Sequence, residues 1–166
     1  MKSNMHAIES ITTHLIQIGE DPKREGLVET PSRVVKSWDQ LYSEYKQNPE
    51  DVMKNFKEGA GDEIVLLKNI EMYSMCEHHM LPFFGKAHIG YIPDDNRIIG
   101  ASKLARVLEI YVRRMQVQER IGEQVTDAFM KYLRPQGAIC IIEAKHLCMS
   151  ARGVEKQNSL FVTSLL

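Results

Sequence analysis

Apolar residues recur at helical spacing in the first part of the chain. They follow one another at steps of three and four residues, at Met5, Ile8, Ile11, Leu15 and Ile18. This spacing places them on one face of a helix, and Gly19 follows at once as a stop signal. The pattern therefore predicts an N-terminal helix that ends near Gly19.

A second helix is predicted to begin at Thr30, because a threonine cap followed by a proline is a typical helix start. Asn48 and Pro49 repeat this start signal, which predicts a short third helix. The apolar stripe of the second helix is formed by Val34, Trp38, Leu41 and Tyr45.

The pattern changes after the stretch Gly59-Ala60-Gly61. Residues 63–75 and 83–93 are dense in apolar and β-branched side chains, and a turn at 94–96 closes the second run. Such runs predict two strands. We therefore expect a helical segment over residues 1–58 and a core over residues 59–166 that together form one functional domain.

Two further helices precede two final strands. A turn at 135–137 separates them from strands predicted over 138–149 and 159–166. Ser102 is the predicted cap of the first helix, and a break near Met115 precedes the second. The two stripes are Leu104, Val107, Leu108, Tyr111 and Met115, then Val117, Ile121, Val125, Phe129 and Leu133.

The element order after the N-terminal segment is thus ββααββ. This order predicts an α+β fold, with an antiparallel sheet and both helices on one of its faces. One face of such a sheet stays uncovered, which favours closure against other copies of the chain.

Composition narrows the classes of function. The 166 residues are enough for one domain with its own core, and 21 basic against 22 acidic residues leave a net charge of −1. Such a balance does not favour a nucleic acid or an acidic membrane as partner. No apolar run suits a signal peptide or a membrane span, and three cysteines do not suit a disulfide framework. A cytoplasmic protein with reduced thiols is the expectation.

Metal-ligating residue types gather at two places. Cys76 and His79 have a C-x-x-H spacing, which lets both side chains reach one ion. His146 and Cys148 would share one face of the predicted strand 138–149. Cys140 has the same parity but would lie about 26 Å from Cys148 along that strand, so we interpret it as a buried core thiol.

Three interpretations of this cluster are open. Cys76, His79 and Cys148 form a Cys₂His set that leaves one position of a zinc ion free, as in catalytic sites, with His78 and His146 beside it. If His146 is a fourth ligand, the zinc is structural instead. The third interpretation has no metal and only hydrogen-bonded histidines.

Two weaker signals concern a binding site for an anion and a binding site for a nucleobase. Ser102, Lys103 and Arg106 stand at a predicted helix start, where an anion would explain the two cations, and Arg152 could reach the same anion. A solvated basic turn is the alternative. The two oxygens of Glu119 match adjacent N–H donors such as N1–H and N2–H₂ of guanine, whereas an exposed helix carboxylate without a role is the alternative.

The motifs CEHH, GASKLAR, QVQER and HLCMSARG, in this order, resemble those of the GTP cyclohydrolase I family. The resemblance covers nearly the whole chain and includes GEDPKREGLVETPSRV near the N-terminus. It implies the tunnelling (T-) fold and a homodecamer of two face-to-face pentameric rings. Members of the family usually continue beyond the position that corresponds to Leu166, which is an expectation about length only.

The resemblance also implies an activity and its residues. The activity converts GTP and water to 7,8-dihydroneopterin triphosphate and formate, the first step in the biosynthesis of tetrahydrofolate, other pterins or deazaguanine products. The implied zinc ligands are Cys76, His79 and Cys148. The implied acid–base residues are His78 and His146. The implied triphosphate contacts are Ser102, Lys103, Arg106 and Arg152, and the implied purine-recognition pair is Gln118 and Glu119.

Two other hypotheses compete with this one. Related T-fold enzymes act on a pterin or a deazaguanine through a three-histidine zinc site, or through a nucleophilic cysteine with NADPH. The C-x-x-H-H and H-x-C spacings fit neither pattern well. A zinc-stabilised ring that serves only as a binding scaffold is the non-enzymatic alternative.

Overall fold

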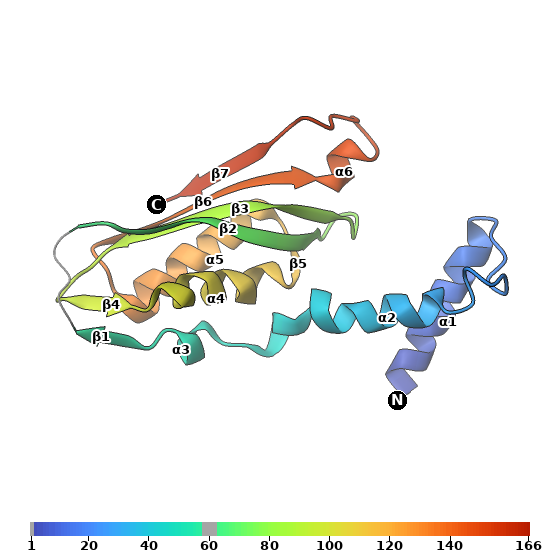
Figure 1. The fold of residues 1–166 in the computed structure, drawn as a ribbon, viewed down its shortest axis with the longest axis horizontal. Helices are drawn as coiled ribbons and strands as arrows, with labels where there is room; N and C mark the ends of the chain where they lie inside the picture. Colours follow the sequence, from blue (N-terminus) through green and yellow to red (C-terminus); the bar gives the residue numbers. More distant parts are fainter. Residues whose placement is uncertain (1, 58–62) are drawn as a thin grey trace. The chain divides into compact units, whose positions relative to one another are not determined.

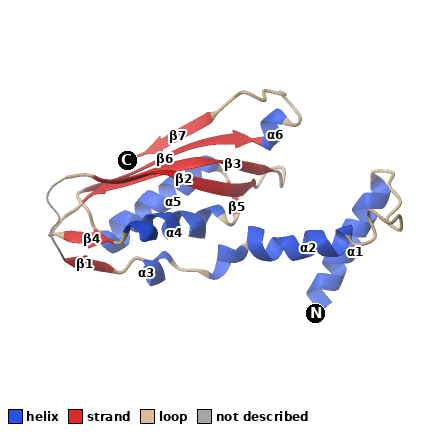
Figure 2. Cartoon of the chain, in the orientation of Figure 1, coloured by secondary structure: helices blue, strands red, loops and turns tan. Residues whose placement is uncertain are grey.

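The computed structural model describes residues 2–57 and 63–166, which Figures 1 and 2 show as ribbons. The chain divides into two compact units, Met1–Ser43 and Glu44–Leu166. The change of pattern predicted at Gly59-Ala60-Gly61 lies outside the described residues. The fold is α+β, as predicted, and each unit is considered by itself.

The first unit contains α1 (Lys2–Gln17) and α2 (Thr30–Leu41), close to the two helices predicted there. Gly19 follows α1 with a φ of +89°, a conformation that glycine adopts without steric cost. The predicted cap of α2 is wrong by one residue. Glu29 is the cap, Thr30 is already helical, and Pro31 is buried within the first turn, where its missing N–H costs no hydrogen bond.

Two short elements follow α2 along the chain. The 3₁₀-helix η1 (Ser43–Lys46) contains Tyr45, which was predicted in the stripe of α2, because α2 ends at Leu41. The one-turn helix α3 (Pro49–Val52) begins as predicted, since Asn48 Oδ1 accepts a hydrogen bond from the Glu50 N–H at 3.1 Å.

Five strands form the main sheet, in the order β5-β2-β3-β6-β7. Their bounds are β2 Val65–Cys76, β3 Pro82–Ile92, β5 Met115–Gln116, β6 Gly137–His146 and β7 Phe161–Leu165. The pairs β2–β3, β3–β6 and β6–β7 are antiparallel, but β5 runs parallel to β2. The sheet is therefore mixed, and the prediction of a purely antiparallel sheet was wrong because a two-residue strand shows no periodicity.

A second, two-stranded sheet joins β1 (Asn55–Lys57) to β4 (Arg97–Ile99). The sequence did not predict either strand, since three residues are too few for an alternating pattern. β4 follows the predicted turn 94–96, in which Asp95 and Asn96 both have positive φ.

Helices α4 (Ala101–Val112) and α5 (Gln118–Ala128) cover one face of the main sheet (Figure 1). The π-helix η2 (Phe129–Leu133) continues α5 and ends at Arg134, whose φ is +54°. The cap of α4 is Gly100, not the predicted Ser102, which is already helical. The core between the helices and the sheet includes Phe83, Tyr91, Leu104, Val125 and Phe129.

β6 ends at His146, whereas the sequence predicted a strand up to residue 149. The chain turns at that point into the one-turn helix α6 (Leu147–Ser150). Among the helices of residues 2–57 and 63–166, none combines the length and apolar character that crossing a membrane requires.

Candidate functional site

Strand pairing brings distant parts of the sequence together at one end of the strands of the main sheet. Met75, near the end of β2, pairs with Pro82 at the start of β3. In turn, Phe83 pairs with His146 at the end of β6. Cys76 pairs with Gln116 of β5, directly before α5. The same end of the sheet therefore holds the turn between β2 and β3, helix α6 and the start of α5.

The turn 77–81 has a defined backbone geometry. The Met80 N–H donates to the Cys76 carbonyl at 2.8 Å, and the Cys76 N–H donates to the Leu81 carbonyl at 2.9 Å. Met80 has a φ of +53°, which lets the chain reverse into β3. These bonds hold His79 on the same side of the turn as the Cys76 thiol.

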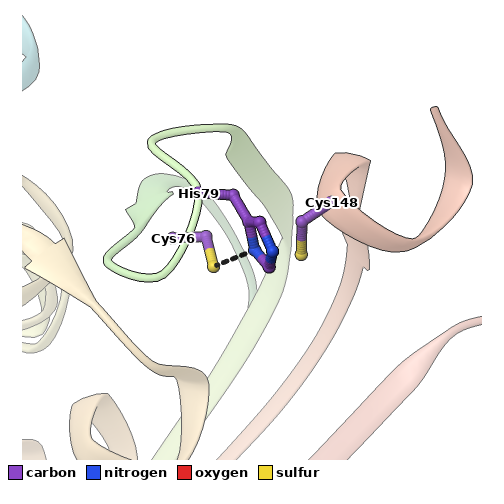
Figure 3. Close-up of side chains that lie close together, drawn as sticks. All are labelled: Cys76, His79 and Cys148. Carbon is purple, nitrogen blue, oxygen red and sulfur yellow. Dashed lines mark hydrogen bonds between the residues drawn. The ribbon is translucent and has the colours of Figure 1, made fainter. Parts of the chain in front are cut away.

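Cys76, His79 and Cys148 point toward one another (Figure 3), and their ligand atoms all lie within 4.8 Å of one another. Cys76 Sγ is 4.0 Å from His79 Nδ1. The ligand atoms of a tetrahedral zinc site are roughly 3.5–3.8 Å apart, so a small closure would seat an ion here. Two thiols and an imidazole are ligands that zinc accepts, and they differ from a three-histidine set.

Cys148 reaches this group from α6, not from a strand as predicted. The predicted convergence is confirmed, but Cys148 does not share a strand face with His146 as predicted, because β6 ends two residues before Cys148. Burial and the adjacent Cys76 thiol raise the pKa of the Cys148 thiol. Cys140 is buried as predicted, and burial raises the pKa of its thiol to about 12.

His146 lies beside this group but is not part of it, so the structure does not favour it as a fourth ligand. Its ring stacks on Phe83 at a centroid distance of 4.5 Å and meets the edge of Phe161 at 5.5 Å. Burial lowers the pKa of His146, and the Glu119 carboxylate acts in the opposite direction. The ring is thus held between aromatic groups near a negative charge.

Gln118 and Glu119 are adjacent in sequence but differ in environment. Gln118 is fully buried, and its Oε1 lies 2.9 Å from His146 Nε2. Its amide nitrogen donates to the carbonyl oxygens of Ile142 and Phe161, both at 3.0 Å. Glu119, in contrast, is exposed in the first turn of α5 and is free to meet a ligand.

His78 and Arg152 flank the three potential metal ligands. His78 is exposed, and its ring lies edge-on to that of His79 at a centroid distance of 6.3 Å. The guanidinium of Arg152 donates to His79 Nε2 at 2.8 Å. Arg152 therefore places a positive charge at the edge of the metal-ligand group.

Ser102, Lys103 and Arg106 are not brought to this group within one copy of the chain. They occupy the first two turns of α4, whose other end leads to β5 (Figure 1). A helix of 12 residues is about 18 Å long, so its first turn is remote from Cys76. Arg106 instead lines a cavity of about 250 Å³ with Glu44, Gln47, Val52, Glu109 and Ile110.

Sequence reasoning missed two features of the site. Glu77 and Arg120 form an ion pair between the turn 77–81 and α5, although both lie inside motifs that the sequence singled out. The burial of Gln118 was also missed. Its spacing with Ile121, Gly122 and Val125, all buried, was the available signal, since positions i, i+3, i+4 and i+7 share a helix face.

Comparisons with known proteins show the family of the chain. The family model of GTP cyclohydrolase I matches residues 7–166. A protein of Wolinella succinogenes named GTP cyclohydrolase 1 is 57% identical over 157 residues, which cover 94% of this chain and 83% of the relative. Proteins of the same name from Chlorobium phaeovibrioides and Thermobifida fusca are 55% and 54% identical, over 95% and 90% of this chain and 71% and 73% of theirs. The chain therefore belongs to the GTP cyclohydrolase I family.

Proposed function

We propose that this chain is a zinc-dependent GTP cyclohydrolase I. It would convert GTP and water to 7,8-dihydroneopterin triphosphate and formate. The observation that carries the proposal is the convergence of Cys76, His79 and Cys148 beside His146, in a chain of this family. Residues 59–166 would form its T-fold catalytic core, in the cytoplasm, and the product would serve pterin, folate or deazaguanine synthesis.

Cys76, His79 and Cys148 would hold the zinc ion. Their donor atoms suit zinc in type and number, a small closure would bring them to the distances of a zinc site, and three protein ligands leave one position for substrate or water. When bound there, zinc would make water a nucleophile near neutral pH. The buried Cys76 and the aromatic groups around His146 would limit the access of further water to this side of the site.

His78 and His146 would exchange protons with the substrate. Protonation of an imidazole nitrogen of guanine makes C8 electrophilic, a task that a histidine side chain can perform as general acid. Exposed His78, next to a proposed metal ligand, is suited to this first step. His146 would serve the later steps, in which the ring-opened base loses formate, the ribose rearranges and the pterin ring closes.

Glu119 would select guanine. Its carboxylate is exposed at the start of α5, near His146, and can accept hydrogen bonds from N1–H and N2–H₂ together. Adenine presents a lone pair at N1, so the same carboxylate would face an acceptor without a proton between them.

The triphosphate would be bound by Arg152 and by Ser102, Lys103 and Arg106. The last three lie at the far end of α4, so they can contact the same GTP only if a neighbouring copy supplies them. This separation supports a homo-oligomer whose sites are shared between copies, and we propose the family's decamer of two pentamers.

Product analysis tests the proposal. Purified, zinc-loaded protein is incubated with GTP, and formate is assayed together with pterin fluorescence after oxidation. Both products should form, and His146→Ala should lose pterin formation while His14→Ala, a change at an exposed position of α1, retains it. Formate without pterin in the unchanged protein would mean that the ring opens but the ribose does not rearrange. If protein that binds zinc and forms rings yields neither formate nor pterin, the proposed enzyme activity is overturned and a binding scaffold is favoured.

A further inference from the structure

The side-chain amide of Gln118 can be oriented from its hydrogen bonds alone. One end lies 3.0 Å from the carbonyl oxygens of Ile142 and Phe161 and 3.1 Å from the hydroxyl of Thr163. Carbonyl oxygens only accept hydrogen bonds, so this end must be the NH₂ group, whose two hydrogens they share. The other end is therefore the oxygen.

This orientation determines which nitrogen of His146 carries a hydrogen. Gln118 Oε1 lies 2.9 Å from His146 Nε2, and an amide oxygen has lone pairs but no hydrogen. The bond exists only if Nε2–H donates, so neutral His146 is the Nε2–H tautomer. In the described part of the chain no protein group bonds Nδ1, whose lone pair is left available.

The ring has little freedom to escape this arrangement. It lies flat on Phe83, with an interplanar angle of 5°, and the Phe161 ring meets it at 88°. The carbonyl groups that orient Gln118 belong to β6 and β7, so the sheet itself fixes the amide. With 0% of its side chain exposed, Gln118 has no surface or free hydrogen for a purine.

We propose that Gln118 is a positioning residue, which holds His146 with Nε2 as donor and Nδ1 as proton acceptor, and that it does not read the base. This inference rests on the proposed function, since it takes His146 as an acid–base group. It replaces the role that the resemblance implies for Gln118 and leaves base recognition to Glu119.

The test compares two buried glutamines. Gln118→Met keeps the length of the side chain but removes the bond to His146. Gln116→Met is the matched control, because Gln116 is equally buried but donates to the Tyr111 carbonyl and to Gln124 Oε1 instead. Zinc-loaded, ¹⁵N-histidine-labelled protein is studied by magic-angle-spinning NMR, and His146→Gln assigns the His146 signals.

The unchanged protein and Gln116→Met should show His146 only as the Nε2–H tautomer, and Gln118→Met should show a mixture of tautomers. Turnover by Gln118→Met should fall roughly 100-fold, with the Kd for GTP changed by less than about twofold, as expected for a displaced catalytic group. A single Nε2–H tautomer in Gln118→Met would overturn the positioning role. So would a weakened Kd with the tautomer unchanged, which would return Gln118 to base recognition. If the unchanged protein releases no formate, the proposed function fails, while the tautomer result still decides the geometry.

Discussion

Arg120 and Glu77 form a bidentate ion pair, in which the guanidinium donates two hydrogen bonds to the carboxylate. Arg120 Nη1 lies 2.5 Å from Glu77 Oε2, and Nη2 lies 3.0 Å from Oε1. Glu77 follows Cys76 in the turn between β2 and β3, and Arg120 follows Glu119 in α5. The pair therefore ties the turn 77–81, which contains His79 and follows Cys76, to the helix that starts with Gln118 and Glu119.

Removal of this pair should weaken the fold in a pH-dependent manner. The hydrogen bond and charge of Arg120 lower the pKa of Glu77 below its ordinary value. A carboxyl with a lowered pKa stabilises the fold at pH values above its unfolded pKa, and this contribution is lost as pH falls through the folded pKa. Glu77→Gln should therefore lower the Tm of the metal-free chain at pH 7, and the difference from the unchanged chain should shrink as the pH falls below 4.5, the ordinary pKa of this carboxyl.

A double-mutant cycle isolates the pair from other effects of the two substitutions. Thermal unfolding of Glu77→Gln, Arg120→Gln and the double variant should show coupling at pH 7 that shrinks as the pH falls below 4.5. Coupling of constant size over this pH range would contradict the ion-pair explanation.

Metal content should depend on Cys148 and not on Cys140. Cys148 Sγ lies in the group with Cys76 and His79, whereas Cys140 lies in the core of the sheet. Cys148→Ala leaves only two potential ligands, so the protein should lose its bound zinc after dialysis. Cys140→Ala is the matched control and should keep one zinc per chain by elemental analysis. Zinc retained at full occupancy by Cys148→Ala would remove this thiol from the site.

The convergence of Cys76, His79 and Cys148 was predictable because metal chemistry restricts residue type and spacing so strongly. The path of the backbone around these residues was harder to predict. His146 and Cys148 were placed correctly in space from an assumed strand, yet Cys148 lies on α6. A strand that continued to residue 148 and a helix that begins at residue 147 can both bring the Cys148 thiol to the same end of the sheet. The spacing in the sequence therefore did not distinguish the two.

The fold was predictable where elements are long. The apolar stripes of α4 and α5 and the dense runs of β2 and β3 each extend over ten residues or more. The parallel strand β5 depends instead on where α4 ends and on pairing with Cys76, and tertiary contacts decide both. The same limit applies to the site: whether Gln118 faces His146 or a ligand depends on β6 and β7, far away in sequence.

Glu119→Ala should impair turnover of GTP without loss of zinc. The carboxylate would form hydrogen bonds to two guanine N–H groups, and loss of such charged bonds lowers kcat/KM by roughly 100-fold or more. Glu123→Ala, an exposed carboxylate one turn later on α5, is the control and should retain turnover. Formate release and elemental analysis are measured on the same samples. Normal turnover by Glu119→Ala would exclude this residue from base recognition.

Gly85 should not tolerate replacement by a residue with a side chain. The reason is the lack of room for a Cβ atom, not the backbone conformation. It pairs with Ala144 where β3 and β6 run side by side. A Cβ atom at this position would lie 1.9 Å from the Glu143 carbonyl oxygen and 2.7 Å from Ala144 Cα. Both are backbone atoms, so relief requires the two strands to separate. Gly85→Ala should therefore cost about 2–4 kcal/mol of folding free energy.

Gly137→Ala provides the matched control, since Gly137 starts β6 and a Cβ there meets nothing within 4 Å. Thermal unfolding of the metal-free chains should show a Tm lowered by about 5–15 °C for Gly85→Ala and little change for Gly137→Ala. Because Gly85 lies two residues after Phe83, the partner of His146, separation of the strands should also disturb the site. Zinc affinity should therefore fall in Gly85→Ala below the unfolding temperature. An unchanged Tm for this variant would show that β3 and β6 do not approach as closely as the structure has them.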